Sequence, residues 1–129
     1  MHDVAIVTVI AFAELLWLGG LVSRARVRYG IAAPAVSGNE IFERHFRVHM
    51  NTLEQLVIFV PSMWIFAQYF NAGWAAALGV LFIIGRLVYA RSYVRDPKSR
   101  LMGSLLTALP TLIFMIGIVW GAVRALLRE

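Results

Sequence analysis

Long apolar stretches alternate with short polar segments along the whole chain. Glu14 is the one charged residue within the first stretch. The predicted spans are residues 4–22, 44–70, 74–93 and 101–127. A helix crosses a bilayer with about 20 mostly apolar residues. The pattern therefore predicts an all-α integral membrane protein, a four-helix bundle with up-down topology that forms a single domain over residues 1–129.

The connections between the predicted spans are short and contain helix-breaking residues. The segment Tyr29–Asn39 holds two glycines and a proline, and the second helix is expected to begin near Glu40. The turn Asn71-Ala72-Gly73 is so short that the helices on either side of it are predicted to be antiparallel neighbours. Such connections leave little chain for any mass outside the bilayer.

Composition supports a membrane protein and excludes several other classes. Apolar residues make up 60% of the 129 residues, more than is usual for a soluble domain. The chain has no cysteine, which excludes disulfides, thiolate metal sites and a cysteine nucleophile, so any thiol must come from a ligand. The first residues lack the basic region and cleavage site of a signal peptide, and we expect the first span to be retained.

The positive charge of the chain is concentrated at two connections, which an even-numbered bundle places on one side of the membrane. By the positive-inside rule this side is predicted to be cytoplasmic, with both termini on the other side. Ten of the twelve basic residues lie there: Arg24, Arg26, Arg28, Arg44, Arg47, Arg86, Arg91, Arg95, Lys98 and Arg100. Nucleic-acid binding is not expected from this placement. The minimal loops fit a bacterial inner membrane better than an endoplasmic reticulum.

Two stripes of polar side chains are predicted to approach the cytoplasmic boundary. At about 100° per residue, the first stripe occupies an arc of roughly 80° on the second helix. It consists of Arg44, Arg47, Asn51 and Glu54. The second stripe, on the third helix, consists of Arg86, Tyr89 and Tyr93. A charged side chain at the bilayer centre costs about 2.5–3.5 kcal/mol on insertion scales, so these stripes are not expected to face lipid.

Two interpretations of the stripes are open from the residues alone. In one, Glu54 pairs with an arginine and the other arginines extend to the headgroups, so that the stripes hold the helices together. In the other, the stripes line a pocket for a zwitterionic, peptide-like ligand. Arginines would bind its carboxylates with bidentate hydrogen bonds, and Glu54 would receive its ammonium group.

The motifs that contain these residues resemble one known family. They are residues 43–55 followed by Phe59-Val60-Pro61, and residues 85–93 followed by Pro97 and Arg100. The resemblance is to the MAPEG family, the membrane-associated proteins in eicosanoid and glutathione metabolism, and it covers essentially the whole chain. This family includes microsomal glutathione transferases, leukotriene C synthase and prostaglandin E synthase.

The resemblance implies a homotrimer of four-helix subunits that binds glutathione as co-substrate between neighbouring subunits, near the cytoplasmic face. The implied glutathione contacts are Arg47, Asn51, Glu54, Arg86, Tyr89 and Tyr93. Arg100 stands in the position of the arginine that stabilises the glutathione thiolate, and it is the candidate catalytic residue. Met50 departs from the pattern, because some members have a further arginine there. Tyr89 replaces a histidine of prostaglandin E synthase, which disfavours prostaglandin isomerisation.

The function expected from this resemblance is a glutathione transferase or peroxidase that acts on lipophilic small molecules dissolved in the membrane lipid. A non-catalytic lipid-binding scaffold of the same fold is the alternative. A small transporter would need a continuous polar path, and the apolar outer halves of the spans give little sign of one.

Two further features of the sequence are candidate sites. His45 and His49 lie four residues apart on one helix but have no accompanying ligand set, so no metal site is expected. Glu14 lies within the first span, where an ionisable side chain usually faces a partner or a cavity. It is expected either to pair with an arginine of the second helix or to line the trimer axis.

Overall fold

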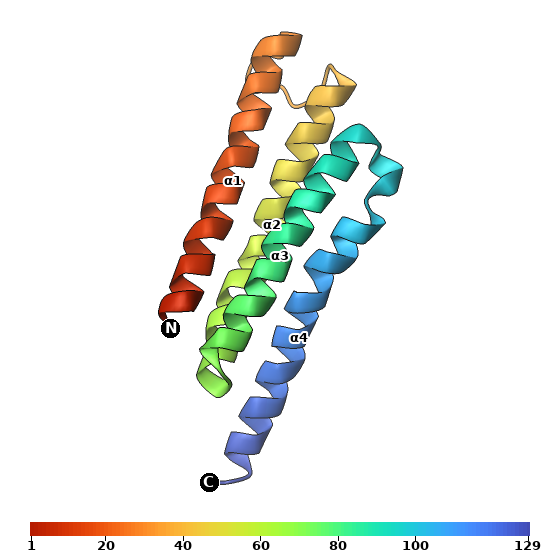
Figure 1. Cartoon of the computed structure of the whole chain (residues 1–129). Coiled ribbons are helices and arrows are strands. Elements are labelled where there is room, and N and C mark those ends of the chain that lie inside the picture. The colour runs from red at the N-terminus through yellow and green to blue at the C-terminus, as the bar shows by residue number, and fades with distance from the viewer.

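The chain folds into four long helices that run alternately up and down (Figure 1). A computed structural model describes all 129 residues. The helices are α1 (His2–Tyr29), α2 (Glu40–Tyr69), α3 (Ala72–Arg95) and α4 (Leu101–Leu126), and a short 3-10 helix, η1 (Pro97–Ser99), precedes α4. Each of the four is long and apolar enough to cross a membrane. The predicted all-α, four-helix architecture is confirmed.

The helix ends differ from the predicted spans because capping groups and helix-forming polar residues extend them. α1 continues past residue 22 through the basic segment to Tyr29, and it ends where Gly30 adopts a left-handed conformation with φ 67°. The side chain of Asn39 accepts hydrogen bonds from two backbone N–H groups at the start of α2. Asn71 does the same for α3, so the turn before α3 is shorter than predicted and the helix already begins at Ala72.

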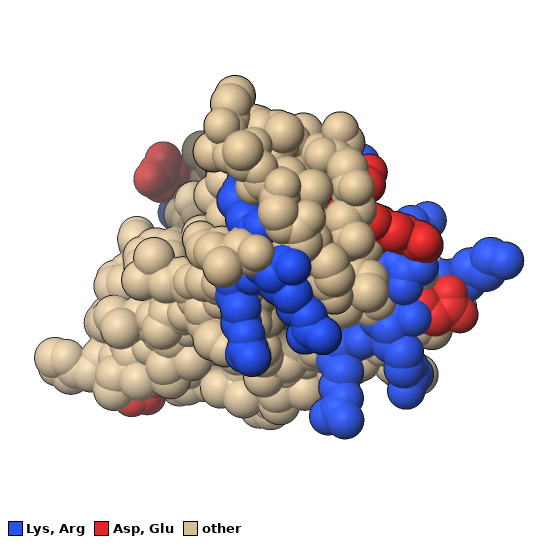
Figure 2. All heavy atoms as spheres, turned by 90° about the horizontal axis from the view of Figure 1, so that it is seen from above, with Lys and Arg blue, Asp and Glu red and all other residues tan.

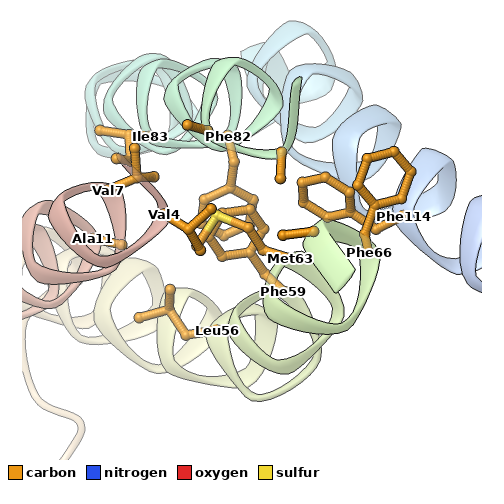
Figure 3. Packing of buried hydrophobic residues seen from close by; sticks show 13 residues of the cluster. Val4, Val7, Ala11, Leu56, Phe59, Met63, Phe66, Phe82, Ile83 and Phe114 are labelled. Carbon is orange, nitrogen blue, oxygen red and sulfur yellow. The ribbon is translucent and has the colours of Figure 1, made fainter. Parts of the chain in front are cut away.

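α2 and α3 form the middle of the bundle, and α1 and α4 lie on opposite sides of this pair (Figure 1). Aromatic side chains fill the centre, as Figure 3 shows. The rings of Phe59 and Phe82 stack with centroids 3.7 Å apart, and Phe114 of α4 tilts against Phe59 at 5.9 Å. Val4 and Val7 close this core from α1. Burial of these side chains fixes the relative positions of the helices that carry the polar residues.

Glycines allow α3 and α4 to approach closely beside the polar stripes. A Cβ atom on Gly85 would lie 2.8 Å from the carbonyl carbon of Leu106, and a Cβ atom on Gly103 would collide with the backbone of Tyr89. Small residues at such positions let two helix backbones pack against each other. The close contact brings the start of α4 next to the polar half of α3.

One end of the bundle, here called the basic end, carries the α1–α2 connection and the α3–α4 connection. Figure 2 looks down onto this end and shows Lys and Arg side chains gathered there, with few acidic ones. Both termini lie at the other end (Figure 1). The outer faces of the helices expose large apolar side chains such as Leu16, Val57 and Ile116, as expected for surfaces that contact lipid.

Candidate functional site

A polar pocket opens between α2 and α4, and α3 forms its floor. Its volume is about 360 Å³. The lining residues are Asn51, Glu54, Gln55, Arg86, Tyr89, Arg100, Ser104, Thr107 and Ala108. Five of the seven site residues predicted from the sequence therefore lie around one pocket. The two that do not line it are Arg47 and Tyr93.

Arg86 is the most deeply placed cation of this pocket. Its side chain is buried, with 3% of its surface exposed. Its Nε and Nη2 atoms donate hydrogen bonds of 3.1 and 2.8 Å to the hydroxyl oxygen of Thr52, itself fully buried on α2. The guanidinium carbon also lies 4.2 Å from the centre of the Tyr89 ring, within the range of a cation–π contact. These contacts hold the guanidinium in one orientation at the pocket floor.

Tyr89 is fixed from two sides. Asn51 donates a hydrogen bond of 2.7 Å from Nδ2 to the Tyr89 hydroxyl oxygen. The ring of Tyr93 stacks against the ring of Tyr89, with centroids 5.5 Å apart. Because the Tyr89 hydroxyl already accepts from Asn51, its own proton is available for an acceptor on a ligand. Tyr93 thus restricts the position of the Tyr89 ring without lining the pocket itself.

The predicted stripe on α2 divides into an inner edge, where Arg44 contacts α3, and an outer edge, where Arg47 and Glu54 are exposed. On the inner edge, Arg44 donates from Nη1 to the carbonyl oxygens of Val94 and Arg95, at 3.0 and 3.3 Å, and pairs with Glu40. Arg44 thus caps the end of α3 and is not part of the pocket. On the outer edge, Arg47 is exposed and has no hydrogen bond or ion pair within the chain.

Glu54 also lies on the outer edge of the stripe, where it lines the pocket and is exposed. The ion pair between Arg44 and Glu40 is the only salt bridge in the structure. The interpretation in which Glu54 pairs with an arginine of the bundle is therefore not found. Its carboxylate faces the pocket together with the guanidinium groups of Arg86 and Arg100.

Arg100 is positioned by the tight connection between α3 and α4. The side-chain oxygen of Asp96 accepts a hydrogen bond from the backbone N–H of Lys98, and the Ser99 hydroxyl donates to the carbonyls of Ser92 and Asp96. This turn places Arg100 directly before the first residue of α4, at the rim of the pocket. Its exposed guanidinium makes no hydrogen bond within the chain, so all its donors are available.

Three polar pocket residues were not among the predicted site residues. They are Gln55, Ser104 and Thr107. Gln55 directly follows Glu54 within the motif. At about 100° per residue, Ser104 and Thr107 lie on the same side of the chain as Arg100, which directly precedes α4, so helical spacing also predicts this third polar stripe. Thr52 was missed because nothing in its own position shows that it receives Arg86.

Glu14 lies on α1 outside this pocket. It is buried, with 7% exposed, and its Oε2 atom has no hydrogen-bond partner. Of the two predicted alternatives, pairing with an α2 arginine is not found, because no ion pair joins them, and a place on the trimer axis stays a prediction. No group of three His, Asp or Glu side chains that could hold a metal ion is found in the structure.

Comparison with known proteins decides the family of the chain. The profile of the MAPEG family matches residues 4–120, which include α2 and α3, most of α1 and α4, and every residue of the pocket. The chain belongs to the MAPEG family. The resemblance inferred from the motifs on α2 and α3 is thereby confirmed.

Several individual proteins align with most of the chain. An uncharacterized protein of Synechocystis sp. is 42% identical over 113 residues, which cover 88% of this chain and 82% of that protein. Microsomal glutathione S-transferase 2 of Homo sapiens is 35% identical over 118 residues, covering 88% and 80%. Leukotriene C4 synthase of Mus musculus is 31% identical over 97 residues, covering 75% and 65%. The similarity therefore extends to a bacterial protein and to animal proteins.

Proposed function

We propose that the chain is a membrane-bound enzyme that binds glutathione in the α2–α3–α4 pocket and activates its thiolate for attack on lipophilic electrophiles or hydroperoxides. The observation that carries the proposal is the gathering of Arg86, Arg100 and Glu54 around one pocket with free hydrogen-bonding capacity. The similarity to a glutathione S-transferase and to leukotriene C4 synthase supports it.

The charges of the pocket are complementary to those of glutathione, a tripeptide with two carboxylates and one ammonium group. Arg86 and the exposed Arg47 are the cations that would bind the carboxylates, and Glu54 would bind the ammonium group. Asn51 and Tyr89 would position the peptide backbone through hydrogen bonds. Tyr93 contributes by holding Tyr89 in place.

Arg100 is the proposed catalytic residue. A neighbouring guanidinium lowers the pKa of a thiol from about 8.5, so more of the reactive thiolate is present at neutral pH. The thiolate would attack an electrophilic carbon, where a C–S bond forms as the leaving group departs with its electron pair. With a hydroperoxide, the thiolate sulfur would attack the terminal oxygen, so that an S–O bond forms, the O–O bond breaks and the alkoxide leaves to be protonated to the alcohol. The thiolate of a second glutathione would then attack the oxidised sulfur, forming the disulfide and releasing the oxygen as water.

The exposed charges of α2 indicate what covers the open side of this pocket. Arg47 and Glu54 are exposed on a membrane-spanning helix, and charged side chains there need protein or water as neighbours. We infer a homotrimer in which a neighbouring subunit covers this face and completes the pocket. The active site would lie on the cytoplasmic side, and a bacterial inner membrane is the proposed location.

The decisive experiment measures glutathione binding to the detergent-purified protein by isothermal calorimetry, together with thiolate absorbance near neutral pH. We expect binding with a thiolate signal. Arg100→Ala should retain binding, lose the thiolate signal and lower kcat about 100-fold, the typical cost of removing one group that stabilises developing charge. Arg124→Ala, an exposed arginine at the far end of α4, is the matched control and should change neither.

Two outcomes would overturn the proposal. Saturating glutathione that produces neither heat nor a thiolate signal would favour the alternative, a non-catalytic lipid-binding scaffold. Binding that survives both Arg86→Ala and Glu54→Ala unchanged would place glutathione elsewhere on the protein.

A further inference from the structure

A second concavity lies on the opposite side of the bundle from the polar pocket. It runs between α1 and α3, with α2 as its floor, and has a volume of about 520 Å³. It is lined by Trp17, Leu18, Leu21, His45, Val48, Leu87, Ala90, Arg91, Val94 and Arg95. We call it the α1–α3 groove. It shares no residue with the polar pocket, so it is a separate feature of the molecule.

The two ends of the α1–α3 groove differ in chemistry. Trp17 and Leu18 lie within the apolar part of α1, and with Leu87 of α3 they form a hydrophobic wall. Arg91 and Arg95 lie near the end of α3, which is at the basic end of the bundle. The groove is therefore apolar at the depth of the membrane core and cationic where α3 approaches the membrane surface.

A smaller hollow extends the cationic end. It has a volume of about 330 Å³ and shares Leu21 and His45 with the α1–α3 groove. It adds Arg24 and Arg28 of α1 to the groove's cations. Neither concavity is lined by a single Asp or Glu. The positive charge of this region is thus not neutralised by the protein at the site itself.

We propose that the α1–α3 groove binds an anionic glycerophospholipid of the surrounding bilayer. An acyl chain would lie along the apolar wall beside Trp17, and the phosphate would contact the guanidinium groups of Arg91 and Arg95. Guanidinium groups in general bind phosphate oxygens through bidentate hydrogen bonds. A zwitterionic lipid is disfavoured because its ammonium group would face the same cations with no carboxylate to receive it. The charge of the groove therefore selects the class of lipid.

Trp17 provides a built-in reporter of acyl-chain contact, because bromine atoms on a lipid chain quench the fluorescence of a neighbouring indole. Trp74→Phe combined with Trp120→Phe leaves Trp17 and the half-buried Trp64, and adding Trp17→Phe measures the Trp64 background. This retains the Trp64 hydrogen bond to Thr8 inside the bundle. The protein is reconstituted in nanodiscs of phosphatidylcholine containing a minor fraction of brominated phosphatidylglycerol or, separately, of brominated phosphatidylcholine.

We expect brominated phosphatidylglycerol to quench Trp17 several-fold more effectively than brominated phosphatidylcholine at the same mole fraction. Arg91→Gln combined with Arg95→Gln should abolish this preference, since each arginine near the membrane surface contributes about fivefold to the binding of an anionic lipid. Arg124→Gln combined with Arg128→Gln is the matched control, since it removes two arginines at the opposite end of the bundle, and it should leave the preference unchanged. The readout does not depend on glutathione.

Three outcomes would overturn the proposal. Equal quenching by the two brominated lipids would mean that Trp17 contacts bulk acyl chains without selection. Absence of quenching by either lipid would show that the groove is covered by protein, such as a second copy of the chain. A preference that persists in the Arg91 and Arg95 variant would mean that these cations do not bind the headgroup.

Discussion

The buried contact between Arg86 and Thr52 shows how much a single hydroxyl contributes to the candidate site. Two guanidinium nitrogens donate to this one oxygen, and both residues are almost completely buried. Thr52→Val keeps the shape of the side chain but leaves both donors without that acceptor, which typically costs about 1–3 kcal/mol. We expect a thermal unfolding temperature in detergent that is several degrees lower, together with weaker glutathione binding because Arg86 loses its fixed orientation.

Thr111→Val is the control for this prediction. Thr111 is also buried, but its hydroxyl bonds only to the backbone carbonyl of Thr107 in its own helix, and the substitution leaves no charged group unsatisfied. We expect little change in unfolding temperature for Thr111→Val. Equal effects of the two substitutions would mean that the Arg86 contact contributes nothing specific.

At the scale of helices, the distance between α3 and α4 depends on two glycines. Gly103→Ala would place a methyl group against the backbone of Tyr89, which cannot move away as a flexible side chain would. Overpacking of this kind costs about 1–3 kcal/mol. We expect a lower unfolding temperature and also weaker glutathione binding, because Tyr89 on α3 would move away from Arg100, which directly precedes α4.

Gly20→Ala offers a matched test of the same substitution. Gly20 lies within α1, and a Cβ atom there would meet nothing within 4 Å. Since alanine favours helix over glycine by about 0.5–1 kcal/mol, this variant should be as stable as the parent or more stable. Destabilisation by Gly20→Ala as large as that by Gly103→Ala would contradict the close-packing argument.

The helices were predictable because the four apolar stretches match the length needed to cross a bilayer. The exact ends were less predictable, since the left-handed cap at Gly30 and the Asn71 cap depend on backbone conformation. In the candidate site, helical spacing correctly brought Asn51 and Glu54 to one pocket. It assigned Arg44 to the same stripe, although Arg44 binds the end of α3, because spacing along one helix does not reveal what the neighbouring helix presents.

At the scale of the whole molecule, the distribution of charge predicts the orientation in the membrane. The absence of cysteine allows single cysteines to report it without background. Ser37→Cys lies in the connection at the basic end, and Glu129→Cys lies at the other end. In intact bacterial spheroplasts we expect a membrane-impermeant maleimide to label residue 129 but not residue 37, which should react only after permeabilisation. The reverse pattern would place the polar pocket on the outer side.

The assembly of subunits is the second property of the whole molecule. One face of α2 carries charged side chains and is not suited to contact with lipid. Arg47 and Glu54 are exposed there, whereas the exposed residues on much of α4, such as Ile116 at 70%, are apolar. A second copy that covers the α2 face would shield these charges and close the polar pocket. For the homotrimer proposed above, native mass spectrometry is expected to give three times the 14.4 kDa mass of the chain.

The mass alone does not show which face is covered, so spin labels at two positions complete this test. A nitroxide on Glu54→Cys should be poorly accessible to oxygen dissolved in the bilayer, while one on Ile116→Cys should be readily accessible. The cysteine-free chain again supplies a clean background. Equal oxygen accessibility at the two positions would mean that the charged face of α2 contacts lipid, with the free-energy cost of charged side chains in a bilayer. The subunits of the proposed trimer would then contact each other through another face.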